Sequence, residues 1–105
     1  MTEVREFLDR KGHSPYRAWF DRFNAPAAAK VATAVTRLAL GNFSNVKGVG
    51  SSVFELRIDF GPGYRVYFGK DGEHLVILLG GGTKQRQQHD INAAIADWED
   101  YKRRK

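Results

Sequence analysis

Cysteine is absent from the 105-residue sequence, and so is any long hydrophobic run. Without cysteine the chain can form neither disulfides nor thiolate–metal sites, and it has no cysteine nucleophile. The longest apolar run, Leu75 to Leu79, is far too short to span a bilayer. The segment from Met1 to Glu6 has no apolar signal core, so we expect a cytoplasmic protein with no membrane contact.

Internal repeats, low-complexity stretches and linkers are absent too, which favours a single domain over residues 1–105. Acidic residues are fewer than basic ones: the chain has 12 Asp and Glu and 17 Lys and Arg, which gives a net charge of +5. The pI is about 9.7. This excess is compatible with a polyanionic partner such as a nucleic acid, and equally with a basic protein that binds none.

Helical patterns fill the first part of the chain. Ser14-Pro15 combines an N-cap residue with proline at the first helical position. Asn24-Ala25-Pro26 ends this helix and starts a second one, which Gly41-Asn42 stops. The two helices predict a helical hairpin, while Val4 to Leu8 fits either an edge strand or a first helical turn. The apolar face of the first helix consists of Tyr16, Trp19, Phe20 and Phe23.

The hydrophobic period then falls from about 3.6 to about 2, which indicates strands. Predicted strands cover Val53 to Phe60, Tyr64 to Phe68 and Leu75 to Leu79, and the last is apolar throughout, as in a central strand. Gly80-Gly81-Gly82 is expected to break that strand before a polar loop, and Asp90 to cap a final helix. This order predicts an α+β fold with an antiparallel sheet.

The register of the first two predicted strands brings two arginines together. With a three-residue turn at 61–63, Asp59 faces Arg65 and Arg57 faces Tyr67, so the arginines are diagonal neighbours on the polar face. Two guanidinium groups this close repel each other unless an anion lies between them, which favours a phosphate site. The alternative is that Asp59 neutralises Arg65 and Glu55 neutralises Arg57 as ordinary ion pairs.

Further candidate residues flank this polar face. Lys47 precedes the sheet, while Lys84 and Arg86 follow the glycines, which either cradle a phosphate or form a flexible turn. The ring of Tyr67 could stack on an unpaired base. His89 lies near these cations and could transfer protons. The histidines lack metal-ligand spacing, so we expect no metal and no cofactor.

Three segments of the sequence, taken together, resemble the RelE/ParE toxin superfamily, and above all its HigB-like branch of addiction module killer proteins. The resemblance covers nearly the whole chain. It implies the RelE-like α+β fold, a small antiparallel β-sheet with an N-terminal helical hairpin and a C-terminal helix. The segments are Phe54-Glu55-Leu56-Arg57-Ile58-Asp59, Gly63-Tyr64-Arg65-Val66-Tyr67-Phe68 and Gly81-Gly82-Thr83-Lys84.

The resemblance also implies a function: the toxin of a type II toxin–antitoxin system, acting as a ribosome-dependent mRNA endonuclease, or mRNA interferase. In such enzymes the RNA 2′-hydroxyl attacks the adjacent phosphate without a metal. Arg65 then has the implied role of stabilising transition-state charge, and Arg57 of handling substrate and phosphate. Lys84 matches the cation after the glycine-rich strand end, and Lys47 matches approximately. The implied partners are mRNA on the ribosome and a helix-turn-helix, HigA-like antitoxin, through which the complex would reach operator DNA.

The chain departs from the RelE pattern at the proton-transfer groups. Residues 87–90 read Gln-Gln-His-Asp where RelE members carry a tyrosine, and Glu55 replaces a second basic residue. His89 is the substitute candidate for proton transfer, with Tyr67 as the second. ParE-like members share the fold but block DNA gyrase, and a fold alone does not fix a target. A gyrase blocker and an inactive homologue that only binds its antitoxin therefore remain alternatives.

Overall fold

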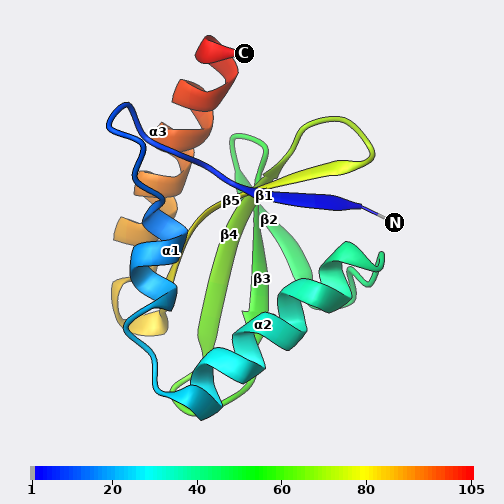
Figure 1. The fold of residues 1–105 in the computed structure, drawn as a ribbon, viewed down its shortest axis with the longest axis vertical. Coiled ribbons are helices and arrows are strands. Elements are labelled where there is room, and N and C mark those ends of the chain that lie inside the picture. Colours follow the sequence, from blue (N-terminus) through cyan, green and yellow to red (C-terminus); the bar gives the residue numbers. More distant parts are fainter. Residues whose placement is uncertain (1) are drawn as a thin grey trace.

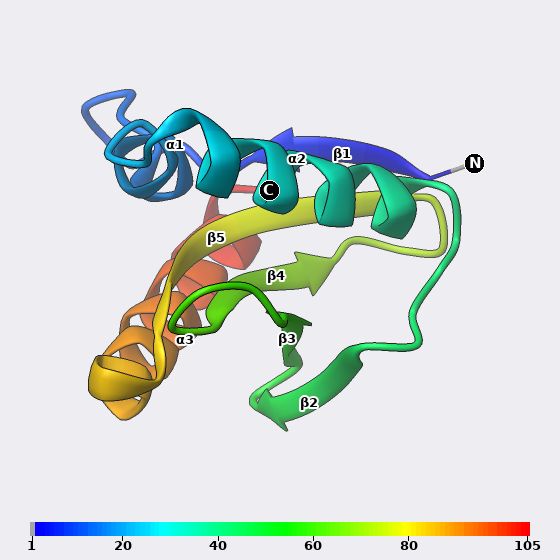
Figure 2. The ribbon, with the colours of Figure 1, turned by 90° about the horizontal axis from the view of Figure 1, so that it is seen from below.

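The computed structural model describes residues 2–105 as a mixed five-stranded sheet with helices on both faces (Figures 1 and 2). The predicted α+β fold is confirmed, and it is consistent with a RelE-like fold. The elements in chain order are β1 (Glu3–Glu6), α1 (Pro15–Phe20), α2 (Ala25–Ala39), β2 (Val46–Gly50), β3 (Val53–Ile58), β4 (Tyr64–Lys70), β5 (Leu75–Thr83), a short 3-10 helix (Lys84–Arg86) and α3 (Gln87–Arg104).

The strand order across the sheet is β1-β5-β4-β3-β2. Neighbours are antiparallel except β1, which runs parallel to β5, so the prediction of a purely antiparallel sheet is wrong. The open interpretation of residues 4–8 is resolved as an edge strand. Strand β2 was not predicted, and it pairs with β3 through a hairpin at the other edge of the sheet.

The predicted helical hairpin is confirmed by its caps. The Ser14 hydroxyl accepts the Arg17 backbone N–H at 3.0 Å, and the Asn24 side chain accepts the Ala27 N–H at 3.0 Å. Each such cap contributes about 1 kcal/mol. Helix α1 is shorter than its apolar pattern, since it ends at Phe20.

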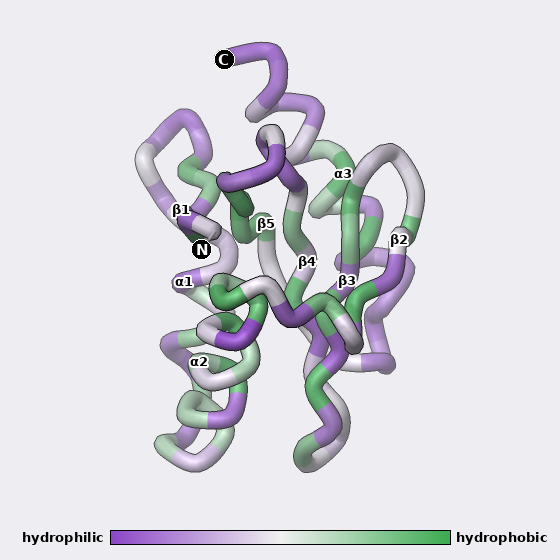
Figure 3. The backbone as a smooth tube through the Cα atoms, turned by 90° about the vertical axis from the view of Figure 1, so that its right-hand side faces the viewer, coloured by the Kyte–Doolittle hydropathy of each residue, from purple (hydrophilic) through white to green (hydrophobic). Residues whose placement is uncertain are grey.

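The sheet separates two hydrophobic cores. Helices α1 and α2 cover one face over Leu56, Val66 and Leu78, and α3 covers part of the other over Tyr67 and Leu79. Apolar segments run through the middle of the molecule, whereas the C-terminal end of α3 is hydrophilic (Figure 3). Because α3 packs mainly against β4 and β5 (Figure 2), part of its face of the sheet stays open at β2 and β3.

The glycines after Leu79 belong to β5, so the predicted strand break is wrong. A Cβ on Gly81 would overlap the Trp19 ring of α1, and a Cβ on Gly69 would overlap the Trp98 ring of α3. Each tryptophan therefore packs flat against the sheet at a residue without a side chain. These contacts fix both helical layers close to the central strands.

Candidate functional site

The α3 face of the sheet carries two arginines from neighbouring strands. Arg57 on β3 is paired with Arg65 on β4, and Glu55 is paired with Tyr67. The expected register was wrong by two residues, because β3 ends at Ile58 and the turn spans residues 59–63. A shift of two keeps every side chain on its predicted face, so the arginines still share the polar face.

Glu55 lies at the centre of this face with only 1% of its surface exposed. Its Oε1 accepts a hydrogen bond from Gln87 Nε2 at 3.0 Å and a longer one from the Tyr67 hydroxyl at 3.4 Å. Arg65 Nε lies 3.1 Å from Oε1, and Lys47 Nζ lies 3.6 Å from Oε2. The carboxylate therefore joins β2, β3, β4 and α3 through one buried charge.

The ion pairs are the reverse of the predicted alternative. Glu55 neutralises Arg65, while Asp59 lies 3.8 Å from Arg57, with 84% of its side chain exposed. The Arg65 side chain is only 12% exposed, whereas that of Arg57 is 57% exposed. Arg65 is thus held in place by a buried partner, and Arg57 is the arginine that is free to meet a ligand.

A cavity of about 160 Å³ opens beside Arg57. Its basic residues are Lys47 and Arg57, its acidic residue is Glu55, and the neighbouring loop adds polar groups from Ser44 and Asn45. Cationic and amide side chains donate hydrogen bonds to phosphate oxygens. The arrangement therefore suits an anion better than a cation. Within residues 2–105, no group of three or more His, Asp or Glu side chains is placed to hold a metal ion.

The start of α3 borders the same face. The expected polar loop is instead a 3-10 helix followed by α3, which begins at Gln87, so Asp90 is not its cap. The Asp90 carboxyl packs against Gly82, the β5 residue paired with Arg65. Gly82 thus accommodates a carboxyl and does not form a phosphate-cradling loop. Burial is the main cause that raises the pKa of Asp90.

The predicted residues of this segment lie at the surface. Lys84, Arg86 and His89 are all exposed where β5 passes into α3. Lys84 directly follows Thr83, whose ladder partner is Tyr64, the residue before Arg65. The structure therefore places the start of α3 next to the two arginines.

Tyr67 does not match its expected role. Its side chain is 0% exposed beneath α3, so its ring cannot stack on an incoming base, and that expectation is wrong. Burial, followed by the charge of Glu55, raises the pKa of its hydroxyl, which disfavours Tyr67 as a proton acceptor near neutral pH. Sequence reasoning also missed Gln87, whose contact with Glu55 depends on how α3 docks.

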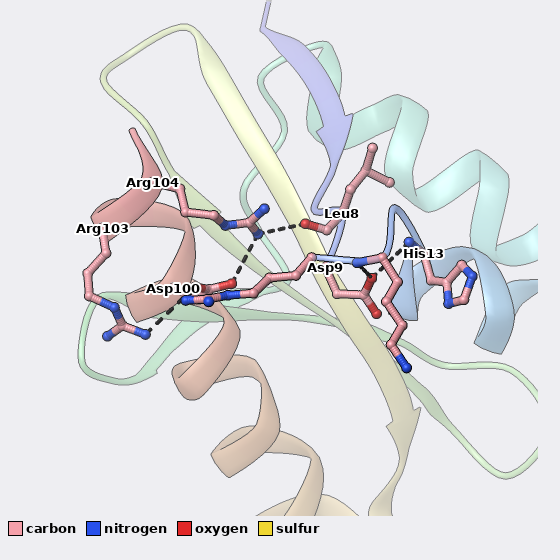
Figure 4. A network of polar contacts seen from close by, with 8 residues as sticks. Leu8, Asp9, His13, Asp100, Arg103 and Arg104 are labelled. Carbon is pink, nitrogen blue, oxygen red and sulfur yellow. Dashed lines mark hydrogen bonds and ion pairs between the residues drawn. The ribbon is translucent and has the colours of Figure 1, made fainter.

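The basic C-terminus of α3 is bound to acidic and carbonyl groups away from this site. Arg104 lies 3.1 Å from Asp100 and donates a hydrogen bond of 2.6 Å to the Leu8 carbonyl. Figure 4 shows how these side chains lie. These contacts tie the helix to the loop after β1. The remaining ion pairs of this segment are Lys102–Glu99, Arg103–Asp100, Arg10–Asp100 and Lys105–Asp71. The helices of residues 2–105 include none that is long and apolar enough to cross a membrane.

Comparison with known proteins places these elements in a family. Residues 18–96 match the family described as "Phage derived protein Gp49-like (DUF891)", a toxin-like family related to RelE- and HigB-type toxins. The family is associated with toxin–antitoxin modules, which implies an antitoxin partner. The chain is also 45% identical over 80 residues to an uncharacterised protein of Haemophilus influenzae, covering 75% of this chain and 81% of that protein. The site lies within the matched residues.

Proposed function

We propose that this chain, which belongs to the phage-derived Gp49-like family of toxin-like proteins, is the toxin of a toxin–antitoxin pair and cleaves mRNA on the ribosome. The observation that carries the proposal is the cross-strand pair of Arg57 and Arg65, in which Arg57 is exposed and Arg65 is held behind it by Glu55. Together with Lys47 they bring three positive charges, against the two negative charges of Glu55 and Asp59. A surplus of positive charge at a small open cavity favours a phosphodiester.

The proposed reaction needs no group beyond the RNA and the protein. The 2′-oxygen of one nucleotide forms a bond to the adjacent phosphorus, and the bond from that phosphorus to the next nucleotide's 5′-oxygen breaks. The products are a 2′,3′-cyclic phosphate and a free 5′-hydroxyl, with one proton moved from the 2′-oxygen to the 5′-oxygen. Negative charge grows on the phosphoryl oxygens in the transition state, where fixed cations stabilise it.

The exposure of each side chain suggests its role. Arg57 contacts the scissile phosphate, because its guanidinium is exposed at the cavity. Arg65, fixed by Glu55, supplies a pre-organised positive charge beside it. His89 is the candidate for proton transfer, since an imidazole can both accept and donate a proton. Lys84 adds positive charge at the phosphate, while Lys47 and Arg86 hold the RNA backbone on either side.

Replacement of Arg57 by alanine tests this proposal. Arg57→Ala removes an exposed side chain and should leave the fold intact, yet it should lower the cleavage rate about 100-fold, as loss of a transition-state donor does elsewhere. The measurements are growth after induction and mapping of new 5′ ends on cellular mRNA. Arg22→Ala, which removes an exposed arginine that lines none of the site's cavities, is the matched control.

Two results would contradict the proposal. One is a folded Arg57→Ala variant that arrests growth and cuts mRNA as fast as the wild type. The other is intact mRNA in cells that the wild-type protein arrests. DNA damage signalling in those cells would indicate a ParE-like block of gyrase, and growth without arrest would indicate an inactive homologue.

Arg65 needs a gentler substitution than alanine. Arg65→Ala would leave Glu55 buried without its closest cation, and breaking a buried ion pair costs about 3–5 kcal/mol. A loss of activity in that variant could therefore come from unfolding. Arg65→Lys keeps the charge but not the planar guanidinium, so it separates the role in catalysis from the role in folding.

The proposal includes a protein partner. The association of the family with toxin–antitoxin modules is the basis for expecting a small helix-turn-helix antitoxin of the HigA type. In this proposal the antitoxin restrains the toxin and carries the complex to operator DNA. Growth arrest by the chain alone, relieved by co-expression of the neighbouring reading frame, is the expected behaviour.

A further inference from the structure

A second surface adjoins the proposed active site on the other side of Arg57. Three neighbouring cavities, of about 160, 60 and 460 Å³, all have Arg57 and Asn45 in their walls. The first is the cavity already described. The largest lies between α2 and the end of β3, and we call the two further cavities together the α2 groove. Its main lining residues are Lys30, Thr33, Ala34, Arg37, Asn45 and Phe60.

The α2 groove is positively charged. Lys30 and Arg37 lie two helical turns apart on the same side of α2, about 10 Å along its axis. Asp59 is the acidic residue in its wall, and it already lies beside Arg57. Among residues 2–105, the Lys and Arg side chains that make no ion pair are Lys11, Arg22, Lys30, Arg37, Lys70, Lys84 and Arg86.

The distribution of these unpaired cations has a pattern. Lys84 and Arg86 lie at the start of α3, and Lys30 and Arg37 lie in the α2 groove. The C-terminal cations of α3, by contrast, are all engaged with carboxylates. Cations without an internal partner are readily available to phosphates. Four of the seven therefore flank Arg57, while Lys11, Arg22 and Lys70 lie elsewhere on the surface.

The groove also offers an aromatic surface. Lys30 Nζ lies 5.5 Å from the centre of the Phe60 ring, which is partly exposed in the groove wall. A flat ring next to cations is the combination that binds single-stranded nucleic acid, since bases stack on the ring and phosphates meet the cations. The Asn45 amide, shared by all three cavities, adds hydrogen-bonding groups between the two regions.

We propose that the α2 groove binds the single-stranded RNA that flanks the scissile phosphate, with Lys30 and Arg37 contacting backbone phosphates. This inference rests on the proposed function, because it extends the RNA path from Arg57 around the edge of β3. The groove would then set affinity for RNA and leave the chemical step unchanged. An acidic peptide of a protein partner is the competing occupant, which the experiment below distinguishes.

The test compares two double variants that remove the same charge. Lys30→Ala/Arg37→Ala changes the groove, and Lys11→Ala/Arg22→Ala removes two unpaired cations elsewhere on the surface. Binding of a fluorescein-labelled, unstructured 12-nucleotide RNA is followed by anisotropy at several salt concentrations. The groove variant should bind at least tenfold more weakly at low salt. Its slope of log K against log salt should be shallower by about 1.4, because each single-strand phosphate contact contributes about 0.7. The control should bind nearly as the wild type does.

A cleavage measurement adds a second readout. On ribosomes carrying mRNA, the groove variant should show a raised KM with kcat retained, as expected when uniform binding is lost. RNA binding by the groove variant equal to that of the control would overturn the inference and leave the nuclease proposal standing. So would an unchanged RNA affinity with lost affinity for an acidic peptide. A wild-type protein that neither binds this RNA nor cuts mRNA on ribosomes would instead overturn the proposed function itself.

Discussion

At the scale of single residues, sequence patterning predicted which face a side chain occupies but not which partner it meets. The alternation of β3 and β4 correctly placed Arg57 and Arg65 on one face. It could not show that Glu55 would be buried against Arg65, because that depends on α3 bringing Gln87 over the carboxylate. The sequence also could not show that the Arg57 side chain is exposed and that of Arg65 nearly buried, since this depends on which part of the sheet α3 covers.

Asp90 gives a prediction at the same scale. Its pKa is raised, mainly by burial against Gly82. Because the pKa of this carboxyl is higher in the folded than in the unfolded state, the protonated form stabilises the folded protein. This stabilisation is complete below the unfolded pKa of about 3.9 and is lost as pH rises through the folded pKa. The Asp90→Asn variant removes this ionisation, so it should be more stable than the wild type at pH 7. Urea unfolding from pH 7 down to pH 4 should show the difference shrinking. A less stable variant at pH 7 would mean that the ionised carboxylate is favourable.

At the scale of elements, local signals were sufficient wherever a cap or a period marks the structure. The Ser14 and Asn24 caps predicted the hairpin of α1 and α2, and alternation predicted β3 and β4. The glycines of β5 were wrongly predicted to break the strand. Glycine is required there because Trp19 and Asp90, from other elements, occupy the space of a side chain at Gly81 and Gly82. Strand β2 was missed because its hairpin turns at Ser51-Ser52, a pair without the usual Asn-Gly signal.

This serine turn can be improved. Ser51 and Ser52 have φ angles of 53° and 65°, a left-handed conformation that disfavours residues other than Gly, Asn and Asp. Ser51→Asn/Ser52→Gly should therefore stabilise the protein by about 1 kcal/mol, or about 4–8 °C in Tm. Thermal unfolding measures the change. Ser44→Gly is the control, since Ser44 does not have a positive φ and glycine there should not stabilise. Equal shifts in both variants would show that turn strain is not the cause.

At the scale of the whole molecule, the composition gave a net charge of +5 but not its distribution. The sequence ends in Lys102-Arg103-Arg104-Lys105, the densest run of positive charge, yet all four are paired with carboxylates. Four of the seven unpaired cations lie instead on either side of Arg57, on α2 and at the start of α3. Resemblance to a toxin superfamily supplied the fold and the family relationship, while the position of the open basic surface required the structure.

The uneven charge distribution leads to a final prediction, in which two variants with equal net charge behave differently. Lys84→Ala/Arg86→Ala removes unpaired cations beside the arginine pair, and Lys102→Ala/Arg103→Ala removes cations engaged with Glu99 and Asp100. If overall charge governed RNA binding, both variants would weaken it alike. Lys102 and Arg103 are already neutralised by carboxylates, so they contribute little to phosphate binding. Only the first variant should therefore lose affinity, by about tenfold in the anisotropy assay at low salt. Equal losses would show that binding follows net charge, and that the start of α3 has no special part in it.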